Sequence, residues 1–187
     1  PARVIWFSSG TKLHEGYYLD GDDIFRADGK GNAVRLMNVN EMHLVGLCNA
    51  ENVMAAMAIT EAAGVPMDTI LSVIRDFPPV PHRIEFVGER AGVKYYNDSK
   101  ATNVDSVEKA LTAFVPGKVV VLLGGHDKGT TLVTLAHAVS SRCKAAVCYG
   151  EAGPRIAQAL RDEDGDMGLV VLQAEHLSDA VQQARER

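Results

Sequence analysis

The chain of 187 residues lacks several features that would assign it to a class of protein at once. It has no apolar run of the roughly 18 residues that a membrane-spanning helix needs, and no charged-then-apolar segment of the kind that directs secretion. Its net charge of −5 argues against a general nucleic-acid binder, which normally carries a basic face. Its cysteines are scattered and form no C-x-x-C pair, so neither a zinc site nor a disulfide framework is indicated. These absences leave a cytosolic protein with reduced thiols as the expectation.

Familiar catalytic patterns are missing as well. The triplet Gly10-Thr11-Lys12 resembles the end of a phosphate-binding loop, but the residue order is wrong and the earlier glycine of G-x-x-x-x-G-K-[ST] is absent. Neither a Ser-His-Asp order nor a cluster of metal ligands can be defended from the sequence. The chain opens on Pro1 without an initiator methionine and runs directly into an apolar strand pattern from Val4 to Phe7. We therefore interpret the sequence as a piece of a longer protein.

What is present divides into two stretches at a proline-rich segment, Phe77 to Pro81, which suits a stiff connector. The stretch before it, residues 1–78, has the pattern of short strands and turns followed by two helices, over residues 49–63 and 66–75. An Asp-Gly pair within residues 20–23 predicts a hairpin there. The hydrophobic content of 47% supports a real core.

The stretch after the prolines, residues 79–187, alternates between strand and helix patterns. Apolar runs predict strands at residues 84–88, 93–96, 118–123, 145–149 and 168–172, and helical spacing predicts helices at residues 104–114, 132–139, 154–160 and 176–185. This alternation favours an α/β fold with a mostly parallel sheet and flanking helices. In such sheets ligands bind at the loops that follow the carboxyl ends of the strands.

The loop Tyr95–Asn103 follows one predicted strand and concentrates polar chemistry. Asp98, Lys100 and Thr102 lie in it, next to the backbone N–H groups of the coming helix, so it could hold a nucleotide or an acidic substrate. The alternative is that Thr102 or Asn103 simply caps the helix. Lys100 favours the site, because a cap needs no cation and the positive end of the helix dipole disfavours one.

A second loop, Gly124 to Gly129, follows the apolar strand that ends at Leu123. If both loops open on the same edge of the sheet, Lys100 and Lys128 converge and suit a carboxylate or phosphate. The alternative for Lys128 is a solvated loop lysine. His126 is more simply interpreted as a surface residue than as a base.

Three further residues are candidates for contacts with a nucleotide. Arg83, directly after the prolines, could stack on a base or bind a phosphate; its alternative is an ion pair with Glu85 or Glu89. Asn49 and Asn52 lie three residues apart at the start of a predicted helix. Asn49 could be only an N-cap, whereas Asn52, further into the helix, could present its amide to a base edge. Cys143 and Cys148 are interpreted as packing residues.

The stretches that carry these candidates resemble a known family. They are Asn97 to Asn103 (NDSKATN), His82 to Glu85, Leu123 to Lys128, and Asn49 to Ala56. Together they resemble the Mur ligases, and among these the enzymes that add D-glutamate to UDP-N-acetylmuramoyl-L-alanine in peptidoglycan synthesis. The resemblance extends over nearly the whole chain. It implies that residues 1–78 are the tail of the central ATP-binding domain. Residues 79–187 would then be a Rossmann-like, amino-acid-binding C-terminal domain that lacks its final stretch.

The resemblance implies an ATP-dependent amide ligase that works through an acyl phosphate. ATP and Mg²⁺ would be the cofactors, and D-glutamate and UDP-N-acetylmuramoyl-L-alanine the small-molecule partners, without nucleic acid or membrane. The enzyme would be a monomer of the bacterial cytoplasm. The family's phosphate loop and metal ligands belong upstream of Pro1, so the resemblance implies that this piece alone does not turn over.

At matching positions, the resemblance places Asn49 and Asn52 against adenine, and Arg83 and Asp98 against the ribose and phosphates. The family usually has a histidine where this chain has Cys48.

Lys100, Thr102 and Lys128 would bind the phosphate and the D-glutamate carboxylates, with Lys100 and Lys128 as the catalytic cations. Such a site would act by positioning and by neutralising charge.

Two other functions remain open. The chain could belong to another amino-acid-adding ligase of the same fold, such as a folylpolyglutamate synthase. It could also be a non-catalytic module that binds a nucleotide or a partner protein.

Overall fold

The computed structural model describes residues 4–165 and 168–187. The chain separates into two compact units, residues 1–100 and residues 101–187. We describe each unit by itself. No helix in the described residues is long and apolar enough to cross a membrane.

The first unit is built on a sheet in the order β1-β2-β3-β4, with strands Phe7–Ser8, Glu15–Asp20, Asp23–Asp28 and Ala33–Asn38. β1 runs parallel to β2, and the remaining neighbours are antiparallel. The predicted hairpin is confirmed: Asp20 pairs with Asp23 around Gly21 and Asp22, and Gly21 has φ 59°, which glycine adopts at no steric cost. A 3₁₀ turn, Val39–Glu41, follows β4.

The helices α1 (Leu47–Ala62) and α2 (Met67–Asp76) complete this core, and both were predicted. They bury apolar side chains against the sheet: Tyr17, Ile24, Met37, Met42, Val53, Met54, Met57, Ala58, Ile70, Leu71 and Ile74. One polar cluster ties α1 to the sheet, because Glu61 accepts a hydrogen bond from the Tyr17 hydroxyl at 2.6 Å and pairs with Arg26 at 2.8 Å. Burial and the Glu61 carboxylate raise the pKa of the Tyr17 hydroxyl, so Tyr17 stays a neutral donor.

The first unit also includes an antiparallel hairpin of β5 (Glu85–Arg90) and β6 (Val93–Asn97). Ala91 and Gly92 make its turn with φ of 51° and 78°. Positive φ at both central residues is typical of a type I′ hairpin turn. The sequence placed this segment in an alternating, mostly parallel arrangement. This placement is wrong for β6, because the strand pairs with β5 in a sheet of its own.

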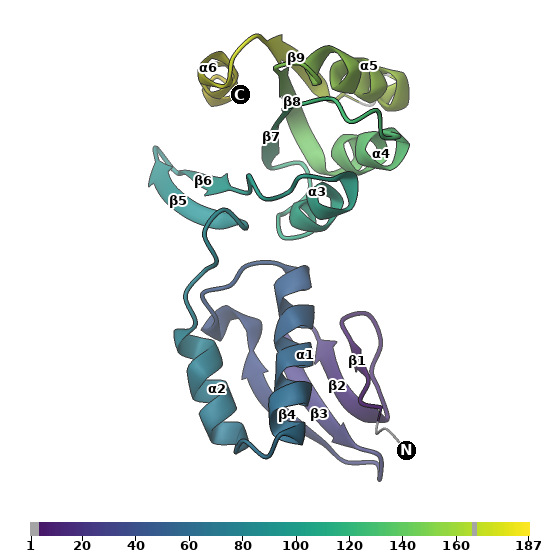
Figure 1. Cartoon of the computed structure of the whole chain (residues 1–187), viewed down its shortest axis with the longest axis vertical. Coiled ribbons are helices and arrows are strands. Elements are labelled where there is room, and N and C mark those ends of the chain that lie inside the picture. Colours follow the sequence, from purple (N-terminus) through teal and green to yellow (C-terminus); the bar gives the residue numbers. More distant parts are fainter. Residues whose placement is uncertain (1–3, 166–167) are drawn as a thin grey trace. The chain divides into compact units, whose positions relative to one another are not determined.

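The second unit is a parallel sheet in the order β7-β8-β9, with strands Val119–Gly124, Cys143–Tyr149 and Val170–Ala174. Helices α3 (Val104–Leu111), α4 (Val133–Arg142), α5 (Gly153–Asp164) and α6 (Leu177–Arg185) flank it. In Figure 1, α4 and α5 lie on one face of the sheet and α6 lies on the other. The predicted α/β fold with a mostly parallel sheet and flanking helices is confirmed.

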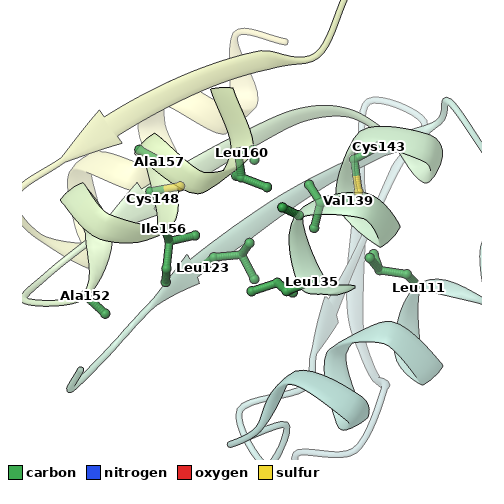
Figure 2. Packing of buried hydrophobic residues seen from close by; sticks show 12 residues of the cluster. Leu111, Leu123, Leu135, Val139, Cys143, Cys148, Ala152, Ile156, Ala157 and Leu160 are labelled. Atoms are coloured by element: carbon green, nitrogen blue, oxygen red, sulfur yellow. The ribbon is translucent and has the colours of Figure 1, made fainter. Parts of the chain in front are cut away.

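Figure 2 shows the core of the second unit, where β7, β8, α4 and α5 bring their apolar faces together. Val139, Cys148, Ala157 and Leu160 are fully buried in it. Burial raises the pKa of Cys148 to about 11 and that of Cys143 to about 12. Both thiols therefore stay protonated and inert, which confirms their interpretation as packing residues.

Besides β6, the structure differs from the sequence expectations at the first strand. The strand predicted from Val4 to Phe7 begins only at Phe7, and Val4 and Trp6 are 64% and 67% exposed. An apolar run predicts burial, but it does not supply the neighbouring strand that burial requires. The domain boundary predicted between residues 78 and 79 stays a prediction.

Candidate functional site

The first half of the candidate site lies in the first unit, where the segment after the prolines is fastened to the end of β6. The Ile84 amide donates to Asp98 Oδ1 at 3.0 Å, and the Lys100 amide donates to the His82 carbonyl at 3.1 Å. Asn97 Nδ2 lies 2.8 Å from His82 Nδ1. These contacts bring two of the stretches that carry the family resemblance, residues 82–85 and 97–100, side by side.

The backbone of this segment is strained. His82 and Ile84 have φ of 65° and 43°, a left-handed region that a β-branched side chain rarely adopts. Ile84 is buried, while Arg83 between them is exposed. The buried Ile84 side chain and the hydrogen bond to Asp98 hold this conformation, which turns Arg83 away from the core. Strain of this kind concentrates at functional sites.

Asp98 itself is half-buried. Burial raises the pKa of its carboxyl group, although the hydrogen bond from Ile84 and the charge of Arg83 act in the opposite direction. Arg83 is exposed and forms no ion pair with Glu85 or Glu89 in the described residues, and the alternative of an interdomain ion pair stays untested. A raised carboxyl pKa beside an exposed guanidinium is compatible with a polar ligand site.

The asparagines at the start of α1 are placed differently from each other. Gly46 is the N-cap of α1, so the interpretation of Asn49 as a cap is wrong; its side-chain amide donates to the Val45 carbonyl at 2.8 Å. Asn52 is exposed, and its side chain makes no hydrogen bond to the described part of the chain. Cys48, where the family usually has histidine, is half-buried, and burial raises the pKa of its thiol.

The second half of the candidate site lies in the second unit. Asn103 caps α3, because its Oδ1 accepts the Ser106 amide at 2.8 Å, and this part of the capping alternative is confirmed. Thr102 precedes the cap and is exposed. Lys128 lies in the loop after β7, and its Nζ donates to the Thr102 carbonyl at 3.1 Å. The structure thus brings Thr102 and Lys128 together, 26 residues apart in the sequence.

The loop that carries Lys128 follows β7 and lies against the start of α5. Arg155 of α5 binds both carboxylate oxygens of Asp127 at 2.7 Å and donates to the Thr130 carbonyl at 3.0 Å. Arg155 therefore lowers the pKa of the Asp127 carboxyl group. His126 is exposed, as predicted, and its Nδ1 lies 2.7 Å from Glu151 Oε2. Sequence reasoning missed Arg155 and Glu151, since neither lies in a recognisable motif.

Glycine at the base of this loop allows a close approach between neighbouring strand ends. A Cβ atom at Gly124 would lie 2.5 Å from the Tyr149 carbonyl oxygen, a distance that real Cβ atoms do not show. Gly125, with φ 118°, accepts a hydrogen bond from the Ala152 amide at 3.0 Å. The loops after β7 and β8 are thereby joined through their backbones at the carboxyl edge of the sheet.

The candidate site residues are divided between the two units. Residues 83 and 98 belong to the first unit, as do Asn49, Asn52 and Lys100; Thr102 and Lys128 belong to the second. The predicted convergence of Lys100 with Lys128 involves both units and stays a prediction. The resemblance implies Mg²⁺, but no group of His, Cys, Asp and Glu side chains in residues 4–165 and 168–187 is arranged to hold a metal ion. These residues do not fit a metal site, and we derive no step through one.

Comparison with known proteins identifies the family. The family model described as Mur ligase, glutamate ligase domain, matches residues 82–187. This match covers more than half of the chain, and the chain belongs to the Mur ligase family.

Within the family, similar curated relatives are named UDP-N-acetylmuramoylalanine–D-glutamate ligase. The relative from Lachnospira eligens is 41% identical over 160 residues, which are 86% of this chain and 35% of the relative. That from Koribacter versatilis is 37% identical over 186 residues, which are 100% of this chain and 39% of the relative. The chain thus spans little more than a third of the length of the curated relatives it matches.

Solved structures support the fold. UDP-N-acetylmuramate–alanine ligase from Thermotoga maritima matches with a TM-score of 0.64 at 16% identity. The match covers 89% of this chain and 39% of that ligase. Folylpolyglutamate synthase from Mycobacterium tuberculosis, complexed with ADP and AMPPCP, matches with a TM-score of 0.64 at 18% identity. The match covers 91% of this chain and 39% of that synthase.

Proposed function

We propose that the chain is the C-terminal part of an ATP-dependent ligase that joins D-glutamate to UDP-N-acetylmuramoyl-L-alanine in peptidoglycan synthesis. The names of the relatives at about 40% identity support this choice of substrate. The observation that carries it is the contact of Lys128 Nζ with the Thr102 carbonyl, 3.1 Å apart. It brings a cation and an exposed hydroxyl residue together at the sheet edge where α/β folds bind ligands.

In the proposed site, Lys128 and Thr102 bind the carboxylates of D-glutamate. Lys128 acts as a compact positive charge, and exchange of the neutral Thr102 carbonyl for a carboxylate adds the attraction of opposite charges to its hydrogen bond. Thr102 adds a hydroxyl donor from the residue before the Asn103 cap. Lys100, on the same loop, faces the phosphate that is transferred. These groups hold two anions together and neutralise the charge that develops between them.

The first unit supplies the proposed nucleotide contacts for ATP. Asn49 and Asn52 offer amides to the adenine edge from the first turns of α1, and Asn52 is exposed for this role. Arg83 and Asp98 hold the ribose and phosphate region; the exposed guanidinium suits a phosphate and the carboxylate suits a ribose hydroxyl. We keep residues 1–78 as the tail of the central ATP-binding domain and residues 79–187 as the amino-acid-binding domain. Mg²⁺ would be held by a part of the whole enzyme that this chain does not span.

The proposed reaction has two steps. A carboxylate oxygen of UDP-N-acetylmuramoyl-L-alanine attacks the γ-phosphorus of ATP, and ADP leaves with the electrons of the broken P–O bond. The amine of D-glutamate then attacks the acyl carbon of the acyl phosphate, phosphate leaves, and the amine gives up its proton. Residues of this chain position the amine and stabilise the anions, which is where most of the rate in such reactions arises. We propose that the chain alone does not turn over, and that the whole enzyme is a monomer of the bacterial cytoplasm.

Ligation by the full-length enzyme that contains this chain tests the proposal. Release of ADP should depend on D-glutamate and on UDP-N-acetylmuramoyl-L-alanine together. Replacing Lys128 by Ala should lower kcat/KM for D-glutamate by about 100-fold or more. The control is Lys118→Ala. It removes an exposed lysine directly before β7, at the opposite end of that strand from the Lys128 loop, and should leave kcat/KM unchanged.

Other outcomes would identify other functions. Turnover with L-glutamate in place of D-glutamate would favour a folylpolyglutamate synthase-like enzyme. Binding of a nucleotide without any turnover would favour a non-catalytic module. A Lys128→Ala variant with wild-type kinetics would contradict the assignment of the acceptor site.

A further inference from the structure

Arg155 is the residue that links the Lys128 loop to the body of the second unit. It lies in the first turn of α5, 28 residues after Asp127. Its Nε and Nη2 donate to the two oxygens of the Asp127 carboxylate, each at 2.7 Å. Its remaining terminal nitrogen, Nη1, donates to the Thr130 carbonyl at 3.0 Å. One guanidinium thus uses its planar fork on a carboxylate and a third donor on the backbone.

These contacts enclose Lys128 on both sides along the chain. Asp127 precedes it and Thr130 follows two residues later, and both are held by Arg155. Asp127 Oδ1 also accepts the Gly129 amide at 2.8 Å, so the backbone around Lys128 is closed into a small ring. The Lys128 side chain is bound elsewhere, because its Nζ donates to the Thr102 carbonyl. Arg155 therefore fixes the backbone from which the Lys128 side chain extends.

The charge of Arg155 also matters to an anionic ligand. Asp127 is the immediate neighbour of Lys128, and an unpaired carboxylate there would attract the Lys128 ammonium group and repel a second carboxylate. Arg155 pairs with both carboxylate oxygens and lowers the pKa of the Asp127 carboxyl group. The Asp127–Arg155 pair is thus ionised and locally neutral, and the positive charge of Lys128 remains available.

We propose that Arg155 is a positioning residue for the acidic amino acid: it orients the Lys128 loop and neutralises Asp127, without touching the ligand. This inference rests on the proposed function, because it takes Lys128 as a ligand-binding cation.

A purely structural role predicts something different. Ion pairs exposed to water contribute little to stability, and the Arg155 and Asp127 side chains are 41% and 27% exposed. If the pair were only structural, removing Arg155 would change the kinetic constants for ATP and for D-glutamate by the same small factor. A positioning role gives a loss confined to the acidic amino acid.

Steady-state kinetics of the full-length enzyme test this. Arg155→Met should raise KM for D-glutamate by about tenfold to a hundredfold, as expected for a displaced binding group, with KM for ATP unchanged. Arg155→Lys should recover part of the loss, since it restores the charge but not the fork. The control Arg161→Met removes an arginine from the same helix whose contact is with the Val171 carbonyl, and it should leave KM for D-glutamate unchanged.

The double variant separates the two effects of Arg155. Adding Asp127→Asn to Arg155→Met removes the unpaired carboxylate, and we expect KM for D-glutamate to recover by roughly fivefold. Equal KM values for D-glutamate in Arg155→Met and wild type would overturn the inference while leaving the proposed function intact. Turnover with L-glutamate but not with D-glutamate would overturn the proposed substrate. The KM values of Arg155→Met and wild type for L-glutamate would then test the role of Arg155.

A measurement independent of turnover completes the test. The Gly129 amide is protected by its bond to Asp127 in the wild-type loop, so hydrogen exchange there should accelerate in Arg155→Met and stay slow in Arg161→Met. An unchanged exchange rate in Arg155→Met would overturn the positioning role, even for an enzyme without detectable activity.

Discussion

Asp98 and Asp127 occupy similar positions in the sequence, each in a polar loop and one or two residues before a lysine. The structure nevertheless shifts the pKa values of their carboxyl groups in opposite directions. Asp98 is half-buried, binds a backbone amide, and has a raised pKa. Asp127 is bound by both nitrogens of an arginine fork and has a lowered pKa. The pattern Asp followed by Lys therefore does not fix the electrostatic role of the aspartate. The partner that folding brings to it decides that role.

The two loops also differ in what holds their backbones. The loop with Asp98 is held by backbone hydrogen bonds to a strained segment with left-handed residues. The loop with Asp127 is held at its base by close backbone packing at Gly124 and at its tip by Arg155. Changes at either anchor should therefore affect one loop and leave the other intact.

The largest effect is expected at Gly124. Gly124→Ala places a Cβ 2.5 Å from the Tyr149 carbonyl oxygen and 2.8 Å from the Tyr149 ring, so backbone must move. We expect a loss of about 1–3 kcal/mol in the free energy of unfolding, as for other overpacked sites. Urea denaturation would measure it. The control Gly10→Ala adds a Cβ that meets no atom within 4 Å, and a similar loss there would show that the close approach is not the cause.

A smaller effect of opposite sign is expected in the β5–β6 turn. Ala91 has φ 51°, which costs alanine energy that asparagine largely avoids, and Asn-Gly is the preferred pair for this turn. Ala91→Asn should therefore raise the free energy of unfolding by roughly 0.5–1 kcal/mol. Equilibrium denaturation would show it as a shift in midpoint without a change in slope. A destabilised variant would contradict the turn assignment.

The smallest effects are expected in the pH dependence of stability, and they have opposite signs. The folded-state pKa of Asp98 is raised. Its contribution to the free energy of unfolding is therefore present at low pH, and it is lost as the pH rises above about 4, the ordinary pKa of an aspartate. The folded-state pKa of Asp127 is lowered, so its contribution is present above about 4 and is lost as pH falls below that value.

Denaturation of Asp98→Asn and Asp127→Asn across this range would check the signs. Relative to wild type, Asp98→Asn should gain stability as pH rises, and Asp127→Asn should gain stability as pH falls. Parallel pH dependences for the two variants would show that the two carboxylates do not differ in the way described.

Much of the second unit could be predicted because each element carries its own signal. The apolar run at residues 118–123 became β7. The helix predicted at residues 154–160 became α5, which continues to Asp164 and ends at Gly165 with φ 48°. The order of strands and helices then followed from general rules of α/β folds. The same rule, that strand ends share one edge, led to the prediction that Lys100 and Lys128 converge, which stays a prediction. It did not predict the contact of Lys128 with the Thr102 carbonyl.

The misses have physical causes. Asn49 was predicted as a possible cap because asparagine favours that position, but α1 starts two residues earlier at Leu47, behind Gly46. β6 was grouped with the parallel strands because its apolar pattern does not reveal its partner. Arg155 could not be found at all, since on a predicted helix it is one more surface cation until the fold places it beside Asp127.

The order β7-β8-β9 has a consequence for how the second unit assembles. Each strand lies next to the strand that precedes it in the chain, and a single helix joins each pair. The contacts of the sheet therefore connect residues that are near one another in sequence, and loop closure between neighbouring strands stays inexpensive in entropy. The sheet can grow by adding one strand at a time at one edge, in the order in which a ribosome delivers them.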